Sequence, residues 1–271
     1  MTLTGMLHPE FWPVVSRLSA VVGICAVLIL VTRRWPSGSA DDAAARAQRA
    51  AGHASMWPRF YVWCAIIAGM AVIIGLGGAV FAAGMLVVGV FAFRELYAAL
   101  RRGFEPFVEG NGAAACAALA WVGAPLVLLV LLRNQPNGFG VVCWVFIVVA
   151  FSDIFAMFGG LIAGRTRFMP SMSPAKTVEG LIAGVAGGLG GALMIRFALP
   201  DSGLTAYLFA SFVLIVAGIV GDLAASAVKR RVGLKDFGSA LPGHGGVMDR
   251  LDSTLAAAPV AYVLATFGIV A

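Results

Sequence analysis

Long apolar runs separated by short polar segments make up almost all of this 271-residue sequence. About eight of the runs approach the roughly 20 residues that an α-helix needs to cross a bilayer. They are the segments 13–32, 60–77, 79–95, 113–132, 139–163, 178–197, 204–226 and 254–271. Apolar runs of this length predict an all-α, polytopic bundle of transmembrane helices. A count of seven or nine spans also fits the pattern.

The basic residues are concentrated in the polar segments. All but Arg17, Arg133 and Arg196 of the 19 Lys and Arg residues fall in four of them. These segments are 33–59, 94–112, 164–177 and 227–253. Because Lys and Arg accumulate on the cytoplasmic side of membrane proteins, we expect four cytoplasmic loops and two outward-facing termini. The chain is then a multi-pass protein of the cell's inner, cytoplasmic membrane.

Composition supports a membrane protein and argues against a nucleic-acid-binding protein. Apolar residues make up 61% of the chain and charged residues 12%, with a mean hydropathy of +0.94. The net charge of +6 does not indicate nucleic-acid binding. Its basic residues lie beside the spans, where they orient the protein and meet anionic lipid heads.

The densest polar segment begins at the end of the seventh span. Asp222, Ser226 and Lys229 share one helical face if that helix continues. A carboxylate so close to hydrocarbon is costly unless it binds a cation, so Asp222 either helps to hold a metal or pairs with a nearby lysine or arginine. Asp249 and Asp252, at the entry to the last span, can face Asp222 if the two helices are neighbours. Converging carboxylates of this kind suit Mg²⁺.

Cations and glycines fill the segment between these carboxylates. The cations would neutralise substrate phosphates, or serve only as anchors at the membrane surface; they are Lys229, Arg230, Lys235 and Arg250. Glycines on both sides of His244, including Gly245 and Gly246, allow close backbone approach to a ligand and expose N–H groups. His244 would then contact a phosphate. The alternative is a mobile loop with an incidental histidine.

A second polar cluster precedes the first. Asp153 interrupts the apolar fifth span and is therefore a functional candidate. Ser173, followed by proline, has the signature of a helix start. Lys176 and Thr177 would then occupy the first turn, where free N–H groups and the helix dipole favour an anion. The alternative is that Glu179 neutralises Lys176.

Together these residues resemble the CDP-diacylglycerol synthase family, also called phosphatidate cytidylyltransferases. Elements of the family signature occur at Ser226, Lys229-Arg230, Lys235-Asp236, Gly238, Leu241 to Gly246, Asp249-Arg250 and Asp252. A second element matches at Ser173 to Gly180. The resemblance covers roughly the C-terminal half, and residues 1–110 match only in being apolar. Phe155 and Met157 depart from the small residue and the tyrosine that the family usually has after the intramembrane aspartate.

The resemblance implies an enzyme that condenses CTP with phosphatidate to give CDP-diacylglycerol and pyrophosphate. The lipid phosphate attacks the α-phosphorus in line, assisted by Mg²⁺ and basic residues. The implied catalytic residues are Asp222, Asp249, Lys229 and His244. The implied metal ligands are Asp222 and Asp249, supported by Asp252 and Asp153. The implied substrate-binding residues are Ser173, Lys176, Thr177, Ser226, Arg230, Lys235, Gly245, Gly246 and Arg250.

The resemblance also suggests a homodimer, and it leaves open whether a monovalent cation such as K⁺ joins the Mg²⁺. We expect residues 1–110 to form a transmembrane scaffold and residues 111–271 the catalytic region. Three alternatives remain. The changes at Phe155 and Met157 allow another lipid acceptor, such as an isoprenoid phosphate. Glycine-rich helices with Asp153 would also suit a transporter or channel, and a catalytically inactive scaffold relative is the third possibility.

Overall fold

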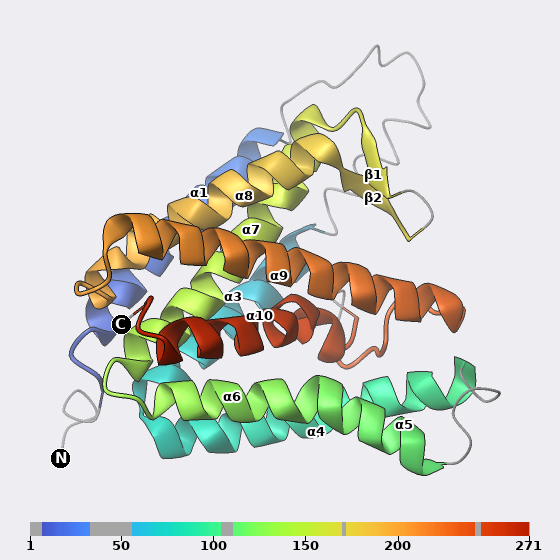
Figure 1. Cartoon of the computed structure of the whole chain (residues 1–271). Coiled ribbons are helices and arrows are strands. Elements are labelled where there is room, and N and C mark those ends of the chain that lie inside the picture. The colour runs from blue at the N-terminus through green and yellow to red at the C-terminus, as the bar shows by residue number, and fades with distance from the viewer. Residues whose placement is uncertain (1–6, 33–55, 104–110, 170–171, 242–244, 271) are drawn as a thin grey trace, which may run out of the picture.

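The computed structural model of the chain describes residues 7–32, 56–103, 111–169, 172–241 and 245–270. Within these ranges the protein is a helical bundle with one short hairpin (Figure 1). The helices are α1 (Phe11–Thr32), α3 (Met56–Gly75), α4 (Gly78–Gly103), α5 (Asn111–Ala118), α6 (Ala124–Arg133), α7 (Gly138–Ala163), α8 (Val178–Ile195), α9 (Leu204–Arg231) and α10 (Met248–Thr266). A π-helical turn, Leu119–Gly123, joins α5 to α6, and a 3-10 turn, Arg196–Ala198, follows α8.

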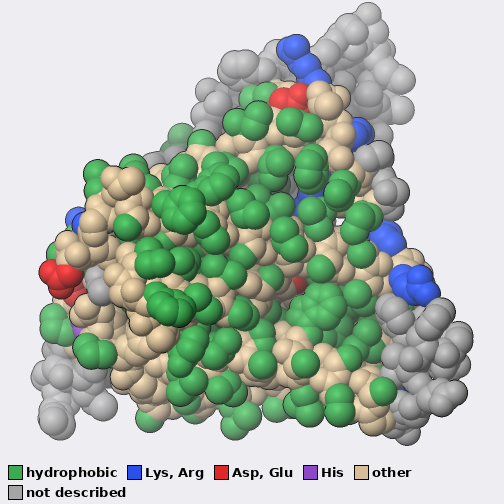
Figure 2. Space-filling model, viewed as in Figure 1, with side chains coloured by type: hydrophobic (Ala, Val, Ile, Leu, Met, Phe, Trp, Pro, Cys, Tyr) green, Lys and Arg blue, Asp and Glu red, His purple; other side chains and the backbone are tan. Residues whose placement is uncertain are grey.

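The described helices confirm a polytopic all-α membrane protein. Five apolar stretches are long enough to span a bilayer: Gly78–Arg102, Gly112–Arg133, Gly138–Ala163, Val178–Ala198 and Leu204–Arg231. The other three predicted spans lie on α1, α3 and α10, which are helical but give shorter described apolar stretches or are more polar. Figure 2 shows hydrophobic side chains over most of one face, with charged side chains mainly at its margins.

Two helix boundaries differ from the predicted ones in a way that bears on the site. Helix α9 continues past the predicted end at 226 to Arg231, so Lys229 lies in its last turn. Helix α10 begins before the predicted start at 254, so Asp249 and Asp252 lie in its first turns. Hydropathy alone placed the end of α9 too early and the start of α10 too late, because it does not register polar turns that continue a helix beyond the hydrocarbon.

Helices α7 and α8 pack closely because small residues line their contact. Gly184 of α8 is buried, and a Cβ added to it would lie 2.9 Å from the Ser152 carbonyl oxygen of α7. A Cβ added to Gly187 would overlap the Phe155 side chain. Small residues of this kind let two membrane helices approach without loss of packing. The close contact fixes Asp153 of α7 relative to the segment that leads into α8.

A two-stranded hairpin interrupts the helical architecture between α7 and α8. Strand β1 (Arg167–Met169) pairs antiparallel with β2 (Ser173–Thr177). Ser173 therefore lies in a strand, and the prediction that it starts a helix is wrong. Helix α8 instead begins at Val178, and the hydroxyl of its N-cap, Thr177, accepts a 3.1 Å hydrogen bond from the Gly180 N–H. Thr177 can act as the N-cap in place of Ser173, because a hydroxyl at the helix boundary can accept a hydrogen bond from the free N–H groups of the first turn.

The connections divide between two ends of the bundle (Figure 1). The hairpin and the α9–α10 connection lie at one end, whereas the α6–α7 and α8–α9 turns and the C-terminus lie at the other. The first end carries segments 164–177 and 227–253, both of which the sequence predicts on the same side of the membrane. The two polar clusters are therefore placed at a common end of the helices.

Candidate active site

The first cluster joins the end of α9 to the start of α10. The Lys229 Nζ lies 2.7 Å from Asp249 Oδ1 and 3.8 Å from Asp252 Oδ2. All three residues are buried, and the Asp249 side chain is only 1% exposed. Two carboxylates around one ammonium leave the cluster with a net negative charge. Burial of these charges is tolerable because each has an opposite partner.

Asp249 also organises the segment between α9 and α10. Its second oxygen, Oδ2, accepts hydrogen bonds from the backbone N–H groups of Phe237 (2.8 Å) and Gly246 (2.9 Å). The Phe237 ring lies 5.2 Å from Lys229 Nζ, within cation–π range. Both oxygens of Asp249 are thus occupied, and the carboxylate holds the two ends of the segment together.

The second cluster joins β2 to the interior of α9. Lys176 Nζ lies 2.5 Å from Asp222 Oδ2, and the two side chains are each 29% exposed. Ser226 Oγ donates a weaker 3.4 Å hydrogen bond to Asp222 Oδ1, which confirms that Ser226 and Asp222 share one face of α9. Of the alternatives for Asp222, the structure shows the ion pair.

Glu179 is not the partner of Lys176. Its carboxylate accepts hydrogen bonds from the backbone N–H groups of Arg165 and Thr166 at 3.1–3.2 Å. It therefore fastens the segment before β1 to the first turn of α8. The suggestion that Glu179 neutralises Lys176 is wrong, because Lys176 pairs with Asp222 and the two backbone amides satisfy the Glu179 carboxylate.

Asp153 links the two clusters. Its carboxyl group interacts electrostatically with Asp222 and Lys176, and the Ser253 hydroxyl lies beside it. Asp252 interacts electrostatically with both Asp222 and Asp153. Acidic groups from α7, α9 and α10 therefore face a common region. Within the described ranges, no group of three or more His, Cys, Asp or Glu side chains is arranged to hold a metal ion, so the metal assignment of Asp222, Asp249, Asp252 and Asp153 stays a prediction.

The remaining predicted binding residues lie around these clusters. The Arg230 guanidinium donates hydrogen bonds of 3.3 Å to the Met172 and Leu234 carbonyl oxygens, which connects α9 to the hairpin. Lys235 and Arg250 are exposed. Gly245 has φ +79°, a backbone conformation that favours glycine. His244 lies outside the described residues, so its predicted role is neither supported nor opposed.

One residue of this site escaped the sequence analysis. Glu95, near the end of α4, accepts a 2.9 Å hydrogen bond at Oε2 from the backbone N–H of Met248. It belongs to the region predicted to be only a scaffold. The available signal was an acidic residue in a helix that is otherwise apolar and basic, but nothing in the sequence indicates which segment lies opposite it.

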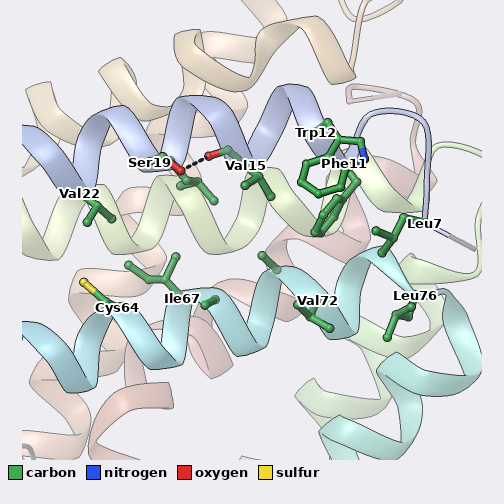
Figure 3. Close-up of a pocket in the computed structure, with 13 residues that line it drawn as sticks. Leu7, Phe11, Trp12, Val15, Ser19, Val22, Cys64, Ile67, Val72 and Leu76 are labelled. Carbon is green, nitrogen blue, oxygen red and sulfur yellow. Dashed lines mark hydrogen bonds between the residues drawn. The ribbon is translucent and has the colours of Figure 1, made fainter. Parts of the chain in front are cut away.

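A cavity of about 590 Å³ lies elsewhere, between α1 and α3. Figure 3 shows apolar side chains, among them Phe11, Val15 and Ile67, pointing into it. Ser19 is there too, but its hydroxyl donates a 2.8 Å hydrogen bond to the Val15 carbonyl oxygen. None of the residues that line the cavity is charged. It therefore has no groups for binding phosphate, in contrast to the clusters on α7, α9 and α10.

The fold and the site together define a class: a polytopic helical membrane protein with lysine and carboxylate groups gathered at one end of the bundle. A sequence profile of the Cytidylyltransferase family matches residues 103–267. Because this match covers more than half of the chain, the protein belongs to that family. The matched region includes both clusters and, of α4, only its last residue, Gly103.

Three relatives are named phosphatidate cytidylyltransferase. The protein from Brucella abortus (strain 2308) is 39% identical over 148 residues, which are 54% of this chain and 55% of the relative. The Helicobacter pylori protein (strain 26695) is 46% identical over 116 residues, 42% of each chain. The Aquifex aeolicus protein is 42% identical over 117 residues, 43% of this chain and 44% of the relative. The chain spans about half the length of the curated relatives it matches.

Proposed function

We propose that this protein transfers the cytidylyl group of CTP to phosphatidate, giving CDP-diacylglycerol and pyrophosphate. The observation that carries the proposal is the meeting of two lysine–carboxylate clusters, Lys229 with Asp249 and Lys176 with Asp222, at one end of a membrane bundle. The names of the relatives support the same reaction. A site of this kind suits a substrate pair in which one member is a water-soluble polyphosphate and the other a membrane lipid.

The reaction needs charge neutralisation more than a protein nucleophile. A phosphatidate oxygen forms a bond to the α-phosphorus of CTP while the bond from that phosphorus to the bridging oxygen of the β-phosphate breaks, and pyrophosphate takes the electron pair. Both reactants are anions, so they repel one another until cations lie between them. Lys176 is accessible enough to meet a phosphate, and the exposed Lys235 and Arg250 can receive the triphosphate.

The carboxylates have the chemistry that the predicted Mg²⁺ requires, and they would have to draw closer together to hold it. Asp153, Asp222 and Asp252 supply the hard oxygen ligands that the ion prefers, and their mutual repulsion decreases when a cation lies among them. When bound, the ion would offset charge on the phosphates and on the departing pyrophosphate. Asp249 would join as a ligand only by giving up Lys229 or its amide donors. K⁺ as a second ion stays a prediction.

Location and assembly belong to the same proposal. The concentration of basic residues around both clusters supports a site at the cytoplasmic face of the inner membrane, where CTP is available. Labelling of Lys235→Cys by a membrane-impermeant reagent, in inside-out but not right-side-out vesicles, checks this placement. A homodimer is expected from the family resemblance, and mass measurement of the protein in lipid nanodiscs tests it.

The activity is tested with purified full-length protein in nanodiscs, supplied with radiolabelled CTP, Mg²⁺ and phosphatidate. A labelled CDP-lipid and an equal amount of pyrophosphate are expected. Asp222→Asn should lower the rate by about 100-fold, because it removes charge where cations and phosphates meet. Asp201→Asn is the matched control, since Asp201 is an exposed turn residue after α8. No CDP-lipid from the wild-type protein would overturn the proposal.

One observation favours a lipid acceptor other than phosphatidate, such as an isoprenoid phosphate. Phe155 and Met157, which replace the usual residues of the resembled family, are 42% and 53% exposed on α7, close to Asp153. Met157 lies four residues from Asp153 and so on the same helical face. A competition between phosphatidate and an isoprenoid phosphate separates the acceptors. CTP binding without turnover of either lipid would indicate the inactive relative.

A further inference from the structure

Glu95 of α4 contacts the α9–α10 segment from the side opposite to the lysine clusters. Its Oε2 accepts the Met248 backbone N–H at 2.9 Å. The N-cap of α10, Val247, has no side chain that could accept from the first free amides. Glu95 therefore supplies from another helix the anionic acceptor that an Asp or Ser would normally supply locally.

Two glycines make room for this carboxylate. A Cβ added to Gly246 would overlap Glu95 Oε2, and a Cβ added to Gly238 would overlap Glu95 Oε1. Neither glycine has a positive φ, so the backbone would accept alanine if Glu95 were absent. The absence of a side chain at both positions is therefore explained by the approach of Glu95, not by backbone conformation.

The same stretches of backbone are held by Asp249 on their other side. Gly246 N–H donates to Asp249 Oδ2, and so does the N–H of Phe237, the residue before Gly238. The segment thus lies between two carboxylates, Asp249 within α10 and Glu95 on α4. Removal of Glu95 leaves one of these two supports in place.

We propose that Glu95 is a positioning residue for the α9–α10 segment, which under the proposed function binds CTP. Helix α4 then contributes to the site. The inference rests on the proposed function and deepens it. Glu95 sets the position of the described residues 232–241 and 245–247 relative to α10, and through them the positions of Lys235 and Gly246. Because Glu95 lies outside residues 103–267, the region of the family match does not contain this support. Neither Lys176 nor Asp222 contacts Glu95, so this pair should keep its geometry when Glu95 is replaced.

The two substrates should therefore respond differently to a change at this position. In Glu95→Ala, we expect kcat to fall about tenfold or more, since small displacements of positioned groups are costly. The KM for CTP should rise several-fold, while the KM for phosphatidate stays within twofold. Glu95→Gln, which keeps an oxygen acceptor, should restore most of the activity. Arg94→Gln, an exposed neighbour on the same turn, is the control and should match the wild type.

A double-variant cycle tests the contact itself. In the wild-type background, Gly246→Ala should push the Glu95 carboxylate away from the Met248 N–H and so impair the enzyme about as much as Glu95→Ala does. In the Glu95→Ala background, the same substitution should cost much less, so the two effects are not additive. Additive losses, or equal changes in both KM values, would overturn the inference even if the wild-type enzyme is fully active.

A measurement without turnover separates this inference from the proposed function. Limited digestion with trypsin should cut after Lys235 faster in Glu95→Ala than in the wild type or Arg94→Gln, as mass spectrometry of the fragments will show. Unchanged cleavage would count against a positioning role. If instead the wild type makes no CDP-lipid while the cleavage rates differ as expected, the proposed function fails and the structural role of Glu95 stands.

Discussion

The two lysine–aspartate pairs of this protein are alike in chemistry and differ in setting. Lys229 and Asp249 are buried, and the carboxylate has a partner for each oxygen. Lys176 and Asp222 are each 29% exposed, and within the described ranges Asp222 accepts one weak hydrogen bond, from Ser226, besides its contact with the lysine. The first pair resists exchange of partners because a buried charge cannot be left alone. The second can exchange its partner for a substrate phosphate or a metal ion at much lower cost.

This difference suggests a division of labour. The buried pair holds the α9–α10 segment in place, and we propose that the exposed pair meets the ligands. Lys176 supplies the positive charge next to Asp222. We expect an incoming phosphate to draw Lys176 away and leave Asp222 for a cation.

The largest effect is expected from Asp249→Ala. It leaves Lys229 buried with only the more distant Asp252 and frees two backbone amides. Loss of one partner of a buried pair costs about 3–5 kcal/mol. Thermal unfolding in nanodiscs should show the loss of stability, together with loss of CDP-lipid synthesis. Wild-type stability in this variant would contradict the description of Asp249 as a buried support.

A double substitution sharpens that result. Lys229→Met with Asp249→Asn removes both charges and retains a side chain that can accept from the Phe237 amide. Replacement of a whole buried pair is often close to neutral for stability, so the melting temperature should recover most of the loss of the single variant. Activity should not recover if Lys229 also has the catalytic role that the family resemblance implies for it. Recovery of both would show that the pair serves folding alone.

Lys176→Met should lower activity strongly and stability only slightly. Because the pair is partly exposed, its loss should lower the free energy of unfolding by less than about 1 kcal/mol. CDP-lipid synthesis should still fall by about 10- to 100-fold, since a cation that faces the phosphates is lost. Arg167→Met, in the paired strand β1, is the control. A large fall in melting temperature with unchanged activity would exchange the roles of the two pairs.

The smallest effect is expected at the start of α8. Thr177→Val removes the N-cap hydroxyl and should cost about 1 kcal/mol of stability, with only a modest loss of activity. Thr177→Ser should restore stability, and Ser173→Ala should leave it unchanged. If Ser173→Ala lowered stability as much as Thr177→Val, it would support the predicted helix start at Ser173 and contradict the observed start at Val178.

Sequence reasoning succeeded where the cause is local. Apolar runs located the helices, and the grouping of Asp222 with Ser226 followed from helical periodicity. It failed at the start of α8, where Ser173-Pro174 has a strong helix-start signature, yet pairing with β1 draws the residues into a strand. Glu179 was misassigned for a similar reason: the backbone amides of residues 165 and 166 approach it only once the hairpin forms.

By itself, the sequence determined that the chain is a helical membrane protein and which segments carry its charged chemistry, because hydropathy and periodicity act over neighbouring residues. The tertiary structure alone decided which lysine meets which aspartate. It also decided that Glu95, more than a hundred residues away in the chain, supports the start of α10. Such pairings depend on how helices pack side by side, and that packing is set by many small contacts over the whole bundle rather than by any local pattern.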